Sequence, residues 1–168
     1  MKKKVVIFLS LFIGLFIGST IKLGYEAKIF KSFFWNTPPK IMNCYGDDLS
    51  RSYITEAISF WESKGEKIGS IDLNPDPETC SGKYIRGYII IRKAASGQLD
   101  YYTLAITHRH ALGIDMRSAV IYFNPDNFKM KNLMAHELGH AMGYGHADIV
   151  GHIMYPEYDK MGPKFWIP

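Results

Sequence analysis

The pattern of apolar and polar positions separates an apolar N-terminal stretch from a longer region of mixed character. Residues 5–21 are apolar or small and carry no charge, and as a helix they would span about 25 Å. Residues 22–38 alternate in character and end in Asn-Thr-Pro-Pro, which interrupts regular structure. We therefore expect a tether over residues 22–38 and one globular domain over residues 39–168.

Two helices are predicted in this domain. The first covers residues 49–64, where Tyr53, Ala57 and Trp61 recur at helical spacing. The turn at residues 46–48 offers its N-cap, and Gly65 is suited to its C-terminal end. The second covers residues 128–142, with caps supplied by the Asn124–Asn127 turn.

Five strands are predicted, one before the first helix and four between the two helices, and the run at residues 84–92 is rich in β-branched and aromatic residues. The predicted strands cover residues 40–44, 67–73, 84–92, 101–108 and 118–124. A loop is expected at Asn74–Pro77. The order of strand, helix, four strands and helix is typical of an α+β fold.

Composition and charge narrow the class of protein. The chain has 168 residues, 47% of them hydrophobic, which is enough for one packed domain. Its net charge is +4, but residues 1–31 hold six lysines and one acid. The remaining 14 basic and 15 acidic residues nearly cancel. The basic charge is therefore a property of the N-terminus, and the domain is not predicted to bind nucleic acid.

The apolar stretch over residues 5–21 has two interpretations. A short basic segment, residues 1–4, precedes it. The stretch is either a transmembrane signal-anchor or a cleaved signal peptide, and its length and the lack of an A-x-A-like site favour the anchor. Three lysines before it predict a cytoplasmic N-terminus and an exported domain. We expect a membrane-anchored or secreted protein, active as a monomer.

The chain contains two cysteines, Cys44 and Cys80. Neither lies in a spacing that is typical of a zinc site. In an oxidising compartment they could form a disulfide across 36 residues, and otherwise they are two separate buried thiols. The sequence leaves both interpretations open.

One stretch at the end of the second predicted helix and just beyond it contains the candidate catalytic residues. It reads H-E-x-x-H-x-x-G-x-x-H, and its members are His136, Glu137, His140, Gly143 and His146. Two histidines four residues apart share one helix face and can bind a single zinc ion. Glu137 is placed to reach a water at the metal, as a general base does. A glycine can end the helix in a left-handed conformation and return His146 as a third ligand.

This motif, together with Met154 eight residues further on, resembles the metzincin clan of zinc peptidases. The Ile-Met-Tyr-Pro segment at residues 153–156 is most similar to the matrixin (matrix metalloproteinase) family. The resemblance implies a mostly parallel twisted sheet, a backing helix, an active-site helix and a short C-terminal subdomain. It places Met154 beneath the histidines and assigns Tyr155 and Pro156 to the wall of the substrate pocket.

The resemblance also implies an edge strand over residues 103–108 that binds an extended peptide. Some matrixin loops hold structural calcium, and residues 74–77 are the candidate here, although an exposed turn is favoured. His108 and His110 are expected in an exposed loop, and His152 is expected to face solvent. Only 14 residues follow Met154, so the C-terminal helix of the clan is reduced to one turn within residues 157–161 or is missing.

The expected function is that of a zinc-dependent endopeptidase that acts on peptide or protein substrates. The alternative is a membrane-tethered binding module with a structural zinc site and little peptidase activity. Glu137 favours the enzyme, because a structural zinc site does not need that carboxylate.

Overall fold

The computed structural model describes residues 31–126 and 128–166, and Lys31–Phe165 form one compact unit. The unit begins before residue 39, where the sequence predicts the domain boundary, because residues 31–35 are hydrogen-bonded to it. Among the described residues, no helix is long and apolar enough to cross a membrane. The predicted segments 1–4 and 5–21 lie outside the described residues.

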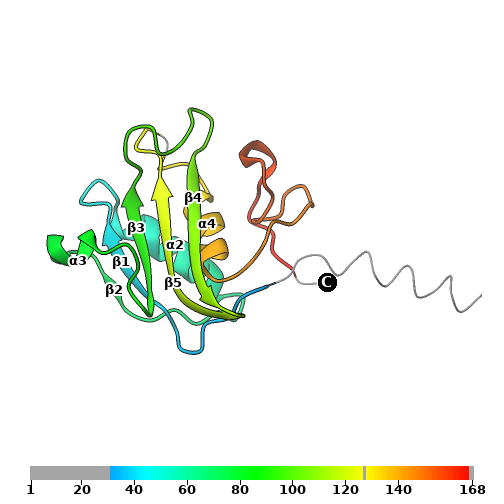
Figure 1. Ribbon diagram of the computed structural model, residues 1–168. Coiled ribbons are helices and arrows are strands. Elements are labelled where there is room, and N and C mark those ends of the chain that lie inside the picture. Colours follow the sequence, from blue (N-terminus) through cyan, green and yellow to red (C-terminus); the bar gives the residue numbers. More distant parts are fainter. Residues whose placement is uncertain (1–30, 127, 167–168) are drawn as a thin grey trace, which may run out of the picture. The chain divides into compact units, whose positions relative to one another are not determined.

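A five-stranded sheet forms the centre of the unit, in the order β2-β1-β3-β5-β4 (Figure 1). All neighbouring strands are parallel except β4 and β5, which form an antiparallel hairpin. Strand β4 therefore lies at one edge and β2 at the other. The strands are β1 (Lys40–Cys44), β2 (Ile71–Asp72), β3 (Tyr88–Lys93), β4 (Ala105–Leu112) and β5 (Asp115–Phe123). The mostly parallel sheet of an α+β fold is confirmed.

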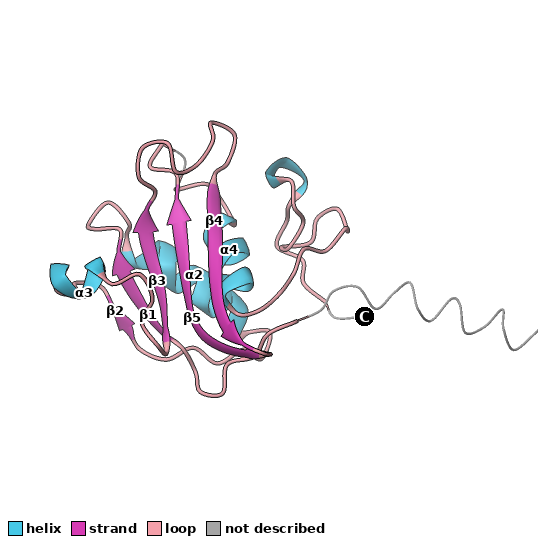
Figure 2. Cartoon of the chain, in the orientation of Figure 1, coloured by secondary structure: helices cyan, strands magenta, loops and turns pink. Residues whose placement is uncertain are grey.

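Helices α2 (Arg51–Glu62) and α4 (Leu133–Ala141) lie behind the sheet in this view (Figure 2). Trp61 of α2 is fully buried, and its indole N–H donates to the Ala135 carbonyl of α4 at 2.7 Å. The predicted cap at residues 46–48 is wrong, because the Ser50 hydroxyl accepts from the amide of Tyr53 and starts α2 there.

Helix α4 begins five residues later than predicted. The Asn124 side chain accepts from the amide of Asp126 at 3.1 Å, so it closes a local turn instead of capping a helix. Asn132 then adopts a left-handed backbone with φ 65° immediately before Leu133. A local side-chain bond and a backbone reversal interrupt what the apolar pattern presents as one continuous helix.

Strand β4 is also displaced from its prediction. The Asp100 carboxylate accepts from the amides of Tyr102 and Thr103 and from the Thr103 hydroxyl, which closes a turn where the strand was expected to start. His108 and His110 consequently lie inside β4, although both are exposed. The predicted loop at these two histidines is therefore wrong, and the residues belong to the edge strand.

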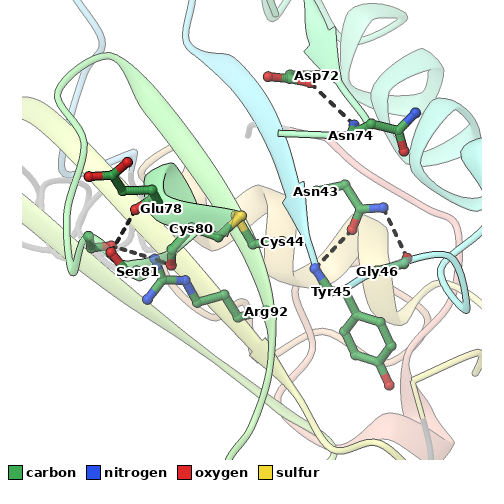
Figure 3. Close-up of a disulfide and its surroundings, with 11 residues drawn as sticks. Asn43, Cys44, Tyr45, Gly46, Asp72, Asn74, Glu78, Cys80, Ser81 and Arg92 are labelled. Carbon is green, nitrogen blue, oxygen red and sulfur yellow. Dashed lines mark hydrogen bonds between the residues drawn. A yellow bond between two sulfur atoms is a disulfide. The ribbon is translucent and has the colours of Figure 1, made fainter. Parts of the chain in front are cut away.

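A short helix that the sequence did not predict, α3 (Pro77–Ser81), begins at the last residue of the predicted loop. A disulfide joins Cys80 of α3 to Cys44 at the end of β1, with an S–S distance of 2.01 Å (Figure 3). The Arg92 guanidinium of β3 donates to the carbonyls of Cys80 and Gly82. A covalent bond and a charged side chain thus hold α3 against the β1 and β3 ends.

Candidate metal centre

Three histidine rings converge beside α4. His136 and His140 lie one turn apart on the helix, with their Nε2 atoms 3.1 Å from each other. The Nε2 of His146 lies 3.1 Å from that of His140. The structure therefore brings together the three histidines of the sequence motif. Among the described ranges 31–126 and 128–166, they form the one group of three or more His, Cys, Asp or Glu side chains placed to hold a metal.

A tight turn after α4 places the third histidine. Gly143 has φ 105°, in the left-handed region that the sequence predicts for it. The amide of Gly143 donates to the His140 carbonyl at 3.0 Å, and the amide of Tyr144 donates to that of Gly139 at 3.0 Å. These bonds close the helix and direct the chain back toward the rings, so His146 reaches the group.

Backbone carbonyls orient two of the rings. The Nδ1 of His136 lies 2.7 Å from the Ile153 carbonyl oxygen, and that of His140 lies 2.9 Å from the Tyr144 carbonyl oxygen. A carbonyl only accepts, so each Nδ1 must be the protonated donor. In a neutral ring the Nε2 atom is then unprotonated, and its lone pair is free to bind a cation. Two lone pairs 3.1 Å apart repel each other unless a cation lies between them.

The spacing of the ring nitrogens is compatible with a tetrahedral zinc site. Two imidazole nitrogens that bind one tetrahedral Zn²⁺ at about 2.0–2.1 Å lie roughly 3.3 Å from each other.

Burial lowers the pKa of His136 to about 4 and that of His140 to about 3. Burial and the charge of Arg109 lower the pKa of His146 as well. All three rings are therefore neutral near pH 7, which is the form that binds a metal.

The floor beneath the rings depends on Gly139. Met154 is fully buried, and a Cβ at Gly139 would overlap both its sulfur and the ring of Trp61. The absence of a side chain at Gly139 lets Met154 approach the helix between the first two histidines. The amide of Ala147 donates to the Met154 carbonyl at 2.8 Å, which connects this floor to the segment that follows His146.

Glu137 lies beside the first histidine and is 5% exposed. The Thr107 hydroxyl of β4 donates to its Oε2 at 2.6 Å. Burial raises the pKa of Glu137 to about 7, and the hydrogen bond from Thr107 opposes that change. The carboxylate is thus held between α4 and the edge strand, in a fixed orientation.

The C-terminal segment differs in part from its prediction. His152 is fully buried, and its Nδ1 accepts from the amide of Met154 at 3.0 Å, so the predicted solvent-facing position is wrong. Tyr155 is buried and Pro156 is exposed, and their role in the substrate pocket stays a prediction. The one helical turn after Met154 is the 3-10 helix η1, Tyr158–Lys160.

Several contributors were not identified from the sequence. Thr107 is thirty residues from Glu137, and no local pattern indicates that the two side chains meet. The carbonyls of Tyr144 and Ile153 act through the backbone, which every residue carries. Gly139 was identifiable in principle, because a glycine inside a predicted helix interior indicates a close approach.

Comparisons with known proteins agree with this arrangement. The model of the Matrixin family (Peptidase_M10) matches residues 55–167, which is more than half of the chain. The match covers α4, the three histidines and the floor residue Met154. No curated protein matches the chain significantly.

Proposed function

Because the chain belongs to the matrixin family, we propose that it is a zinc-dependent endopeptidase whose metal ligands are His136, His140 and His146. The observation that carries this proposal is the convergence of three imidazole rings with the buried Glu137 beside them. A bound zinc ion supplies Lewis-acid activation of a water and of the peptide carbonyl.

Glu137 is proposed to act as the general base. Its Oε2 accepts from Thr107, and within the described residues its other carboxylate oxygen accepts no hydrogen bond. That oxygen is available to take a proton from the attacking water and to return it to the leaving amine. Thr107 orients the carboxylate so that this transfer needs no rearrangement.

Strand β4 is proposed to bind the substrate. It lies at the sheet edge, and its Thr107 touches Glu137. An extended peptide that pairs with an open edge strand gains main-chain hydrogen bonds. A peptide bound along β4 would therefore pass beside the metal centre, with Tyr155 and Pro156 proposed to form the pocket wall.

Export and tethering through residues 5–21 are part of the proposal. Disulfides persist mainly outside the reducing cytosol, so the Cys44–Cys80 bond supports an exported domain. The full-length chain would be handled in a mild detergent because of this apolar segment.

The test is cleavage of a mixed peptide library by the zinc-loaded full-length chain and by its Glu137→Ala variant. We expect the wild type to cleave and the variant to lose about 10²–10⁴-fold in rate, with one zinc ion bound to each. Cleavage that survives in the variant would overturn the role of Glu137. Zinc binding without cleavage by either protein would favour the binding module.

A further inference from the structure

Residues 31–35 form a strap between the end of α4 and the β4–β5 hairpin. The amide of Ser32 donates to the Gly143 carbonyl at 2.9 Å. On the other side, the amide of Phe34 donates to Ile114 at 2.9 Å, and its carbonyl accepts from Met116 at 2.8 Å. The strap therefore bonds through its backbone to the turn after α4 and to the hairpin.

Two further contacts fix the strap to the helix end. The Trp35 indole N–H donates to the Ala141 carbonyl, the last residue of α4, at 2.9 Å. A Cβ on Gly143 would overlap the carbonyl of Phe33. The glycine that ends the helix is thus required twice, for its left-handed backbone and for the closeness of the strap.

A half-buried ionic group closes the strap over Tyr144. The Lys31 ammonium lies 2.6 Å from both carboxylate oxygens of Glu66, and the Tyr144 hydroxyl donates to the same carboxylate at 2.5 Å. The Tyr144 ring stacks on Trp61 with centroids 4.9 Å apart. Lys31 and Glu66 side chains are only 19% and 12% exposed, so this pair is shielded from solvent more than the exposed ion pairs are.

Tyr144 connects this group to the metal ligands. Its carbonyl orients the ring of His140 at 2.9 Å, and it precedes His146 by two residues. We propose that the strap is a positioning element of the metal centre, with Lys31, Glu66 and Tyr144 holding the turn that directs His140 and His146. The inference rests on the proposed function only for the identity of the metal.

The test measures zinc affinity by competition with a chelator, on full-length chains and without substrate. Lys31→Met and Tyr144→Phe should each weaken zinc binding about three- to tenfold, which is less than the 10–100-fold typical of groups bonded directly to ligands. Lys31→Arg, which keeps the charge, should recover most of the affinity. The control is Lys93→Met, because Lys93, at the end of β3, forms an exposed ion pair with Asp48 at 2.9 Å and, among the described residues, makes no contact with the strap.

A second measurement separates positioning from general stability. The ring ¹⁵N resonances of zinc-loaded His140 should shift in Lys31→Met and Tyr144→Phe, and stay in place in Lys93→Met. Unchanged zinc affinity in both strap variants, even with a lower melting temperature, would overturn the inference. An equal loss of affinity in Lys93→Met would overturn it as well.

These outcomes are distinguishable from failure of the proposed function. If the wild type binds zinc but cleaves nothing, and the strap variants still lose affinity, the peptidase proposal fails and the strap inference holds. If the wild type cleaves and the strap variants keep full zinc affinity, only the strap inference fails.

Discussion

The segments at the two edges of the sheet, which we call the β2–β1 side and the β4 side, are held in place by different kinds of bonds. On the β2–β1 side, a disulfide and the Arg92 guanidinium hold α3 (Figure 3). On the β4 side, the metal histidines are oriented by single hydrogen bonds to backbone carbonyls, such as His136 to Ile153 at 2.7 Å. One side depends on a covalent link, and the other depends on single hydrogen bonds and, in the proposed function, on a bound metal.

This difference separates the region that stabilises the fold from the region that contains the proposed metal centre. A disulfide stabilises the fold mainly by restricting the unfolded chain, whatever surrounds it in the folded state. A metal centre needs its ligands oriented to within a fraction of an ångström, so it depends on neighbours that keep each ring fixed. We therefore expect perturbations of one side to leave the other nearly unaffected.

The largest expected effect comes from removing the metal. With free zinc at a thousand times its dissociation constant, bound zinc contributes about 4 kcal/mol to the free energy of unfolding. A chelator should remove that contribution, and hydrogen exchange should accelerate over residues 136–154 but not over residues 40–44. Equal acceleration on both sides would contradict the separation.

The next effect comes from replacing both Cys44 and Cys80 with serine. The disulfide closes a loop of 36 residues, for which chain entropy gives about 3–4 kcal/mol of stability. Urea unfolding should show this loss, while the zinc affinity of the folded variant stays at its original value. A tenfold weaker zinc affinity in the double variant would contradict the comparison.

Gly139→Ala should cost about 2–3 kcal/mol in the free energy of unfolding, since its methyl group must displace Met154 or Trp61 in a packed core. It should also weaken zinc binding, because the floor under the rings moves. The matched control is Gly82→Ala on the other side, where a Cβ meets only ordinary contacts. Normal zinc affinity in Gly139→Ala would show that the floor does not support the ligands.

Thr107→Val should have the smallest effect on stability and a clear one on turnover. It removes the hydrogen bond to Glu137 at 2.6 Å, and about 1.4 kcal/mol of lost orientation corresponds to a tenfold lower rate. Zinc affinity should not change. Thr103→Val is the control, because Thr103 makes the same kind of bond to the exposed Asp100, and its activity should match the wild type.

Local patterns predicted the elements that depend on local order. The periodicity of Tyr53, Ala57 and Trp61 predicted a helix that the structure contains as α2, and the predicted first strand at residues 40–44 is β1, Lys40–Cys44. Element starts were less predictable. The side chains of Asp100 and Asn124 accept hydrogen bonds from neighbouring amides. Because of these bonds, β4 and α4 begin later in the chain than the hydrophobic pattern predicts.

The sequence by itself determined the three histidines, Glu137, the left-handed Gly143 and the α+β order, because each depends on spacing along the chain. Only the tertiary structure decided which distant groups serve them: Thr107 beside Glu137, and the strap with Lys31 and Glu66 around Tyr144. These partners lie 30 to 78 residues apart. Their contacts arise when the sheet edge, α4 and residues 31–35 pack together, and no local periodicity records that packing.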